Sequence, residues 1–316
     1  MLESLRTLRN KLRAQAIPRV EARVKIDVLS TRQVAQLLGV GEATVKRWAD
    51  AGEIDCFRTP GGHRKFRLRD VTFFVQKRQF ETTGPLPTQL PPGADTMGEV
   101  AVSWFEKAAL KGDPSLLVAQ IAALRLRGPT LAEIFDGVVA PALQRIGTKW
   151  EKGQLSVAEE HVASQATADA IARSQPLAEP PGEPNRPDRG VAVVAAVAGE
   201  QHDIGARMAA CLLRARSFEV LAPLAQTPGR DLAELMMRAR AVVTVLTSTM
   251  PENLAVVQEQ VEMAASAAQH TGGLVLVGGA GMRKIGLPPE VRLLSSMQDL
   301  LEQSDQAGRR RALRRA

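Results

Sequence analysis

The chain has 316 residues, of which 45% are hydrophobic and 24% are charged, so it is a folded protein long enough for two or three domains. It lacks the run of about eighteen apolar residues that a transmembrane helix needs, and its basic start lacks the apolar core of a secretory signal. Residues 1–80 carry 17 lysines and arginines against 8 acidic residues, in a chain whose net charge is +7. A basic end on a near-neutral body predicts an anionic polymer as partner.

Two cysteines, Cys56 and Cys211, lie far apart in unlike segments. This usage excludes a disulfide framework and a cysteine-based zinc site, and it indicates a cytoplasmic protein. We expect both side chains to be buried without a chemical role.

Two proline-rich stretches divide the chain. Residues 82–96 contain four prolines and residues 175–189 contain five, and neither stretch has hydrophobic periodicity. Both are predicted to be extended linkers. The predicted organisation is a basic block at 1–80, a linker at 81–96, a helical block at 97–175, a second linker at 176–189 and an α/β block at 190–316.

The basic block contains LSTRQVAQLLGVGEATVKRWADAG, residues 29–52. Its apolar spacing predicts two short helices joined by a tight turn, with Ser30 capping the first helix and Gly52 ending the second. Val45 and Trp48 are expected to face inward on the second helix. A helix, a glycine-containing turn and a basic helix form the pattern of a helix-turn-helix, whose second helix enters the DNA major groove.

The next segment, TPGGHRKFRLRD (59–70), places a Gly-Gly turn between basic residues and predicts a two-stranded wing. Helix-turn-helix and wing together resemble the DNA-binding domain of the MerR family over residues 28–78. The resemblance implies contacts to double-stranded operator DNA from Thr44, Lys46, Arg47, Gly62, His63, Arg64, Lys65 and Arg67. Basic side chains there can bind phosphates, which set affinity but not sequence preference. The alternative is a basic helical module that binds another protein.

The helical block shows apolar positions at helical spacing in four segments, 97–111, 114–127, 130–149 and 156–175. Short connections predict a four-helix bundle. In WEKGQLSVAEEH (150–161), Ser156 and Glu159 form a capping box, so a helix should begin at Val157. Val157, Glu160 and His161 then share one face, with Trp150 in the preceding helix end or loop. The alternative is a bundle core with an exposed Glu-His pair.

The α/β block alternates apolar runs with helical segments. The runs are VAVVAAVA, FEVLAP, AVVTVLTS and GLVLVGG, and helices are predicted at 205–217, 230–240 and 252–270. This alternation predicts a parallel sheet with helices on both faces, which binds ligands at the carboxyl ends of its strands. His202 follows the first strand, within GEQHDIGARM (199–208). From its position alone it could be a catalytic base, a metal ligand or a structural residue.

The segment Glu200-x-His202-x-x-Gly205 resembles the D-x-H-x-x-G motif of cobalamin-binding domains, with glutamate replacing aspartate. The resemblance implies that His202 binds cobalt from below, that Glu200 orients the other imidazole nitrogen, and that Gly205 lets the helix approach the corrin tail. LTSTMPENL (246–254) and LVGGAG (276–281) are similar to the hydroxyl-bearing turn and the Gly-Gly of these domains, although the first departs from the usual S-x-L. The remaining implied cofactor contacts are Asp203, Thr247, Ser248, Gly278 and Gly279.

Trp-x9-Glu-His followed by a cobalamin-type block, with a MerR-type block in front, resembles the CarH/LitR family of light-responsive repressors over about residues 28–310. The implied fold is multi-domain: a winged helix-turn-helix, a four-helix bundle and an α/β Rossmann-like, flavodoxin-like cobalamin-binding domain. The implied cofactor is adenosylcobalamin, covered by Trp150, Val157 and Glu160, with His161 reaching the upper cobalt position after light breaks the cobalt–carbon bond. A dark homotetramer would bind DNA in the nucleoid, and light would release it.

No residue in this scheme needs to be a turnover catalyst. Two alternatives remain open. The chain could be a MerR-type regulator that works without cobalamin or with another tetrapyrrole in the same pocket. It could also be the corrinoid protein of a methyltransferase system, against which the DNA-binding block and the Trp-x9-Glu-His cap argue, because a methyl carrier needs an open upper face.

Overall fold

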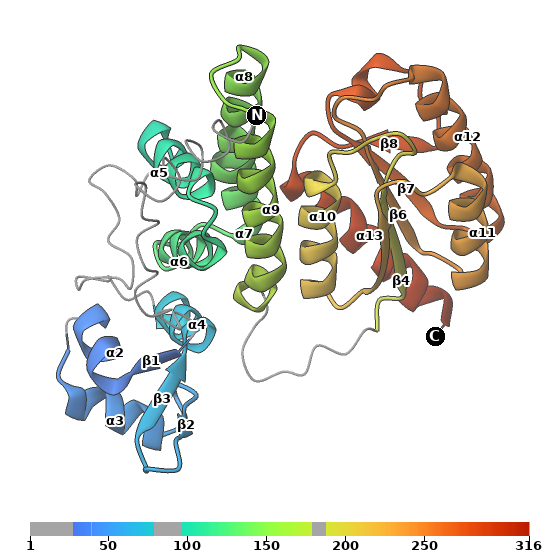
Figure 1. Cartoon of the computed structure of the whole chain (residues 1–316). Helices are drawn as coiled ribbons and strands as arrows, with labels where there is room; N and C mark the ends of the chain where they lie inside the picture. The colour runs from blue at the N-terminus through green and yellow to red at the C-terminus, as the bar shows by residue number, and fades with distance from the viewer. Residues whose placement is uncertain (1–27, 39, 79–96, 179–187, 316) are drawn as a thin grey trace, which may run out of the picture.

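The computed structural model describes residues 28–38, 40–78, 97–178 and 188–315. The predicted first linker and the N-terminal extension lie outside the described residues, as does most of the second linker. Figure 1 shows three groups of elements in chain order: a small α/β group, a group of helices, and a sheet with helices on both sides.

The N-terminal group contains β1 (Val28–Ser30), α2 (Thr31–Leu38), α3 (Glu42–Asp50), β2 (Phe57–Arg58), β3 (Arg64–Arg67) and α4 (Leu68–Arg78). Ser30 and Gln33 cap α2 reciprocally, because the Ser30 Oγ accepts from the Gln33 amide at 3.3 Å and the Gln33 side chain accepts from the Ser30 amide at 2.9 Å. Val45 and Trp48 are buried as predicted, and the Trp48 ring packs on Phe74. The strand β1 was not predicted, and it joins the wing strands in an antiparallel sheet of order β1-β3-β2.

The helical group contains α5 (Glu99–Leu110), α6 (Pro114–Arg125), α7 (Leu131–Ile134), the π-helix η2 (Phe135–Val139), α8 (Ala140–Glu151), α9 (Val157–Ser174) and the 3-10 turn η3 (Gln175–Leu177). The capping box of Ser156 and Glu159 begins α9 at Val157, as predicted. The third predicted helix is not continuous, because η2 separates α7 from α8. Pro141 explains this widening, since it has no N–H and its ring would clash with the carbonyl of Gly137 in a regular helix.

The C-terminal group contains β4 (Val191–Ala196), α10 (Ile204–Ala215), β5 (Glu219–Leu224), α11 (Gly229–Ala239), β6 (Val243–Thr247), α12 (Leu254–Thr271), β7 (Leu274–Gly278), η4 (Gly281–Lys284), β8 (Val291–Leu293) and α13 (Met297–Arg315). The sheet is parallel with order β5-β4-β6-β7-β8, the flavodoxin-like doubly wound order. Alternate side chains of β4 pack toward α11 and α12 on one face and toward α10 and α13 on the other. The strand β8 and the helix α13 were not predicted.

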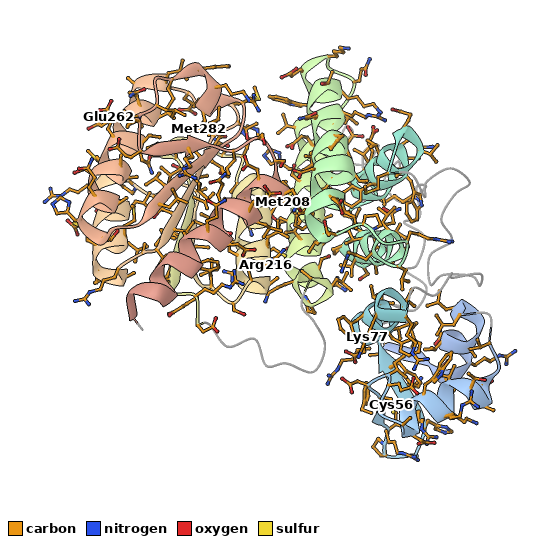
Figure 2. The ribbon with its side chains drawn as sticks, turned by 180° about the vertical axis from the view of Figure 1, so that it is seen from behind. Cys56, Lys77, Met208, Arg216, Glu262 and Met282 are labelled. Carbon is orange, nitrogen blue, oxygen red and sulfur yellow. The ribbon has the colours of Figure 1, made fainter. Side chains whose placement is uncertain are left out.

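The helical group packs against the sheet group through α9 on α10 and through α7 and η2 on α13. Met208, Cys211 and Leu212 of α10 belong to the same apolar cluster as the core of the helical group, and Figure 2 shows Met208 at this boundary. On the other side, α4 of the N-terminal group packs on α6 and η3. Because β4 and β6 are neighbours, the loop after β4 lies next to the loop after β6, at the carboxyl ends of the strands. The N-terminal part of α9 lies on the same side of the molecule.

Candidate functional site

The loop between β4 and α10 carries the central pair of residues. The Glu200 side chain is fully buried, and its Oε1 accepts hydrogen bonds from the His202 ring Nδ1 at 2.6 Å and from the His202 amide at 2.9 Å. Glutamate is one methylene longer than the aspartate that is usual at this position, and it still makes this contact. The extra methylene is accommodated because the carboxylate continues past His202 toward the next strand.

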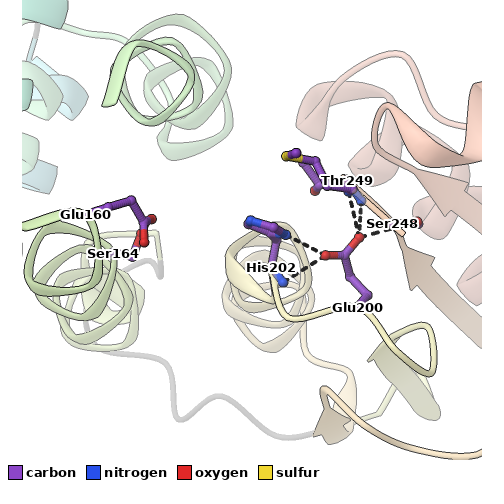
Figure 3. A network of polar contacts seen from close by, with 7 residues as sticks. Glu160, Ser164, Glu200, His202, Ser248 and Thr249 are labelled. Carbon is purple, nitrogen blue, oxygen red and sulfur yellow. Dashed lines mark hydrogen bonds and ion pairs between the residues drawn. The ribbon is translucent and has the colours of Figure 1, made fainter. Parts of the chain in front are cut away.

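The loop between β6 and α12 supplies the other half of the arrangement. Glu200 Oε2 accepts from the backbone amides of Thr249 at 2.6 Å and Met250 at 2.9 Å, and from the Ser248 hydroxyl at 3.4 Å. Figure 3 shows this one carboxylate joining the two loops. β4 and β6 are neighbours in the sheet, and the strands after β4 are added first on one side of it (β5) and then on the other (β6, β7 and β8). Ligands usually bind at this switch point in such folds.

The pair is electrostatically coupled. Burial opposes ionisation of Glu200, but hydrogen bonds from the His202 ring and from three backbone amides together lower its pKa to about 2. The hydrogen bond to Glu200 raises the pKa of His202 against partial desolvation, and the nearby charge of Glu160 raises it further. Glu200 is therefore an ionised acceptor at neutral pH, and it fixes a proton on Nδ1.

With Nδ1 occupied, the other imidazole nitrogen points away from the sheet. The side chain of His202 is 47% exposed, and Figure 3 shows its ring on the side of the loop that faces Glu160 and Ser164 of α9. Within the part of the chain that the structure describes, Nε2 has no hydrogen-bond partner. Glu200 thus fixes the orientation of the His202 ring and keeps a proton on Nδ1.

The residues predicted on the opposite side all lie near the junction of α8 and α9. Trp150 is in the last turn of α8 and Val157 is the first residue of α9, and both side chains are exposed. Glu160 accepts hydrogen bonds from the His161 ring at 2.7 Å and the Ser164 hydroxyl at 2.5 Å. Glu160 lies on the side of α9 that faces His202. The His161 side chain is 70% exposed, and among the described residues only Glu160 forms a hydrogen bond with its ring.

Three other predicted contacts lie beside the Glu200 pair. The Thr247 Oγ1 is buried at the carboxyl end of β6 and has no hydrogen-bond partner among the described residues. Gly205, on the first turn of α10, lies against the Thr247 side chain. Asp203 differs from the prediction in one respect, because Arg207 holds its carboxylate through two hydrogen bonds of 2.8 and 2.7 Å.

The glycines after β7 are required by close approach to the β6 loop. A Cβ at Gly279 would lie 2.2 Å from the Ser248 carbonyl oxygen, and its φ is +101°. A Cβ at Gly281 would lie 2.3 Å from the Ser248 hydroxyl. The Ser248 backbone also donates a hydrogen bond to the Gly278 carbonyl at the end of β7 and accepts one from the Gly281 amide at the start of η4. These contacts fix the rim of the loop that contains Ser248.

The second candidate site is the basic surface of the N-terminal group. Lys46 and Arg47 are exposed on α3, and Thr44 is partly exposed beside them. Gly62 and His63 form the exposed turn between β2 and β3, where the φ of Gly62 is +77°.

The wing residues differ in their freedom to reach a partner. Arg67 is exposed and lies over the Phe57 ring, whereas Lys65 is half-buried. Arg64 forms an ion pair with Asp50 at the end of α3, so it ties the wing to the second helix. A wing contact by Arg64 to DNA would have to share this guanidinium with Asp50.

Sequence reasoning missed several of the residues that complete the sites. Thr249 and Met250 contribute only backbone amides, which carry no residue-type signal. Ser164 follows Glu160 by four residues, so helical spacing could have revealed it. Asp50 could not be linked to Arg64 without the fold.

Three comparisons with known proteins agree with this arrangement. Residues 28–79 match a family model described as a helix-turn-helix domain, and residues 105–174 match one described as a B12 binding domain. The second match covers the helical group with Trp150 and Glu160, not the sheet. Across the described ranges, every helix is too short or too polar to span a bilayer.

The chain is 29% identical over 229 residues to the HTH-type transcriptional repressor CarH of Myxococcus xanthus, a match that covers 65% of this chain and 74% of that protein. It is 38% identical over 68 residues to the transcriptional repressor DcmR of Methylorubrum extorquens, covering 21% of this chain and 25% of that protein. A monomethylamine corrinoid protein of Methanosarcina barkeri has the same fold with a TM-score of 0.52 and 14% identity, over 65% of this chain and 97% of that one. The helix-turn-helix domain, the B12 binding domain and the shared sequence support a CarH-type transcriptional regulator.

Proposed function

We propose that the chain is a transcriptional repressor that binds operator DNA through its N-terminal group and adenosylcobalamin between α9 and the sheet, and that light controls the DNA binding. The observation that carries this proposal is the Glu200–His202 pair. One buried carboxylate fixes the proton on His202 Nδ1 and leaves Nε2 facing the helical group. A carboxylate that holds one ring nitrogen in this way orients the other nitrogen of a histidine toward a metal.

The donor set fits a metal that arrives already chelated. Among the described residues, no three histidine, cysteine, aspartate or glutamate side chains gather as a metal site. A single imidazole would suffice for a metal that a macrocycle already holds, whereas a bare ion would need several protein ligands. A corrinoid would bring its metal already chelated and so meets this requirement.

The edge of the sheet fits the polar tail of such a ligand. The buried Thr247 hydroxyl, which has no hydrogen-bond partner among the residues that the structure describes, can donate to or accept from such a ligand. Gly205 and Gly279 keep side-chain atoms away from the same edge. We assign the tail contacts to Thr247 and Ser248, with Gly278 and Gly279 leaving space for the nucleotide.

The face of α9 would cover the opposite side of the ligand. When bound, adenosylcobalamin supplies a cobalt–carbon bond that light breaks. Trp150 and Val157 present exposed apolar surface that can cover the adenosyl group and exclude water, and the carboxylate of Glu160 can accept its hydrogen bonds. His161, held beside Glu160, would be a second imidazole able to bind the metal, from the side of α9.

In the proposed DNA complex, Thr44, Lys46 and Arg47 lie in the major groove, and the wing contacts the phosphate backbone of the DNA. One such module binds weakly, so a homotetramer that presents several modules to one operator would gain affinity by multivalency. The ligand controls this assembly only if it binds the assembled and dissociated forms unequally. The proposed link is the packing of the helical group, which contacts both the sheet group and α4.

A corrinoid protein that carries methyl groups for an enzyme is the second candidate, favoured by the fold shared with the Methanosarcina barkeri protein. The helix-turn-helix match and the two repressor relatives favour the regulator, and we propose no catalysis by this chain. A repressor that uses another tetrapyrrole would share the Glu200–His202 pair and is an outcome of the test below.

The test measures DNA binding as a function of ligand and light. DNA fragments selected by the protein from a random-sequence pool, in the dark with adenosylcobalamin, serve as the probe. We expect tight binding in the dark and at least about tenfold weaker binding after green light or with His202→Ala, a change of about 1.4 kcal/mol. Equal binding with and without adenosylcobalamin would contradict light control and leave a cobalamin-independent repressor.

A further inference from the structure

Asp136 lies outside the proposed ligand site, in the π-helical segment η2 of the helical group. Its carboxylate accepts hydrogen bonds from the Met297 amide at 2.9 Å to each oxygen and from the Gln298 amide at 3.3 Å. Met297 and Gln298 are the first two residues of α13, which belongs to the sheet group. One side chain of the helical group thus caps a helix of the sheet group, 161 residues away in sequence.

The cap completes the N-terminus of α13. The first amides of a helix have no partner within it, and a negative charge there interacts favourably with the helix dipole. The Ser296 hydroxyl oxygen accepts from the Asp299 amide at 3.0 Å, and the Ser296 carbonyl accepts from the Leu300 amide. Asp136 satisfies the two amides before these, those of Met297 and Gln298. The α13 helix therefore depends on the helical group for part of its own capping.

The surroundings of the contact between Asp136 and α13 suit a role in fixing the helical group against the sheet group. Asp136 is half-buried, and burial raises its pKa while the Met297 and Gln298 amides act in the opposite direction. Met297 packs against both the core of the helical group and the core around β4 and α10. Elsewhere, α9 and α10 meet mainly through apolar side chains such as Met208 and Leu212, which allow sliding more readily than a set of charged hydrogen bonds.

The position of the anchor matters for the ligand site. The helix that begins at η2 continues through α8 to Trp150, which lies roughly 21 Å from Asp136 at 1.5 Å per residue. At that length, a tilt of about 5° around Asp136 would move the Trp150 indole by roughly 2 Å. Figure 1 shows α8 and α9 rising side by side from this end of the helical group to the junction that carries the site.

We infer that Asp136 is a positioning residue that fixes the height and tilt of the Trp150–Glu160 face over His202. This inference rests on the proposed function for its consequence: a ligand with a large upper group depends on Asp136, whereas one with a small upper group depends mainly on the sheet side. The prediction concerns the ratio of the affinity for a ligand with a large upper group to the affinity for one with a small upper group. A general loss of stability would lower both affinities and would not lower this ratio.

The chain offers a matched control. Asp113 caps α6 within the helical group, accepting from the Ser115 and Leu116 amides at 2.9 and 3.2 Å. Asp113→Asn therefore removes a charged cap of the same type without touching the contact between the groups. Asp136→Asn keeps the side-chain shape and loses the charge, and Asp136→Ala removes the cap entirely.

The first measurement uses the protein without ligand. Spin labels at Gln154→Cys, between α8 and α9, and at Glu252→Cys, after β6, report the distance between the two groups in a Cys56→Ser background. We expect Asp136→Ala to broaden or shift the distance distribution, Asp136→Asn to do so to a smaller extent, and Asp113→Asn to leave it unchanged. An unchanged distribution in Asp136→Ala would overturn the inference, whether or not the chain binds a corrinoid.

The second measurement compares dark affinities for adenosylcobalamin and hydroxocobalamin. We expect Asp136→Ala to lower the adenosylcobalamin affinity about tenfold relative to the hydroxocobalamin affinity, and Asp113→Asn to keep the wild-type ratio. Equal losses for both ligands in Asp136→Ala would overturn the positioning role at the upper face. If the wild type binds neither ligand, the proposed function fails, and the spin-label distances alone decide the role of Asp136.

Discussion

Replacing Glu200 by glutamine tests the physical basis of the site, because it changes charge and proton donors while keeping shape. The carboxylate accepts hydrogen bonds on both oxygens, and glutamine has only one acceptor oxygen. We expect the glutamine oxygen to accept from the Thr249 and Met250 backbone amides, because these are two donors. The side-chain NH2 group of the glutamine then faces His202. The His202 amide then loses its acceptor, and Nδ1 becomes an acceptor with the proton moved to Nε2.

The magnitude follows from two observations. Lowering the pKa of Glu200 from 4.5 to about 2 corresponds to about 3 kcal/mol of preference for the charged form in the folded protein. One buried amide without an acceptor and weaker bonds at the others give about 2–4 kcal/mol. We therefore expect Glu200→Gln to lower the free energy of unfolding by about 3 kcal/mol and Tm by roughly 6–12 °C.

The sign of the pH dependence is also fixed. The folded pKa of Glu200 lies below its unfolded value, so its contribution is present above about pH 4.5 and disappears as the pH falls toward 2. The folded pKa of His202 is raised, so its contribution is present below the unfolded value of 6.5 and is lost as the pH rises through the folded pKa. The difference between wild type and Glu200→Gln should be largest between about pH 4.5 and 6.5.

The assay is urea unfolding of the ligand-free protein from pH 2.5 to 8, with Glu252→Gln, at an exposed glutamate of the neighbouring loop between β6 and α12, as control. Nitrogen NMR of the imidazoles gives the tautomer, and the chain has only four histidines. At a pH above the folded pKa of His202, wild type should carry the ring proton on Nδ1 and the variant should carry it on Nε2. A stability loss below about 0.5 kcal/mol, or a loss that does not vary with pH, would refute the reasoning.

Three further variants probe other parts of the account. Thr247→Val removes a buried hydroxyl without a partner among the described residues, so the ligand-free protein should keep or gain stability while adenosylcobalamin binding weakens; a clear loss of Tm would contradict this. Gly279→Ala places a Cβ against the Ser248 loop at positive φ and should abolish corrinoid binding, measured by absorption spectroscopy. Gly286→Ala should not, because a Cβ there meets only the Gln258 side chain, at 4.0 Å. Lys46→Ala should weaken DNA binding and reduce the salt slope by about one, an effect that Lys111→Ala on the helical group should lack.

Much of the fold follows from local patterns in the sequence. Capping by Ser30 and Ser156 fixed two helix starts, and the valine-rich runs identified four of the five parallel strands. The strand β1 escaped prediction because three residues give too short a pattern, and its pairing with β3 is set by the fold. β8 and α13 escaped because a three-residue strand and a strongly charged helix give weak periodic signals.

The sequence predicted which residues form the candidate site, but not the contacts that hold them in place. Glu200 and His202 stand two residues apart, so their contact is local and the sequence could suggest it. The reach of Glu200 to the amides of Thr249 and Met250 depends on β4 and β6 being neighbours, which no local pattern encodes. The cap from Asp136 to α13 joins residues 161 positions apart through a π-helical turn, and nothing in the local sequence indicates it.

The most direct test of the central claim combines absorption spectroscopy with a sizing run. The protein is mixed with adenosylcobalamin in the dark and measured before and after green light, with His202→Ala alongside. The account predicts bound corrinoid with a spectrum of histidine ligation, lost in His202→Ala, and a large species that becomes a small one after illumination. A wild-type protein that binds no corrinoid, or binds it with the same spectrum as His202→Ala, would contradict the account.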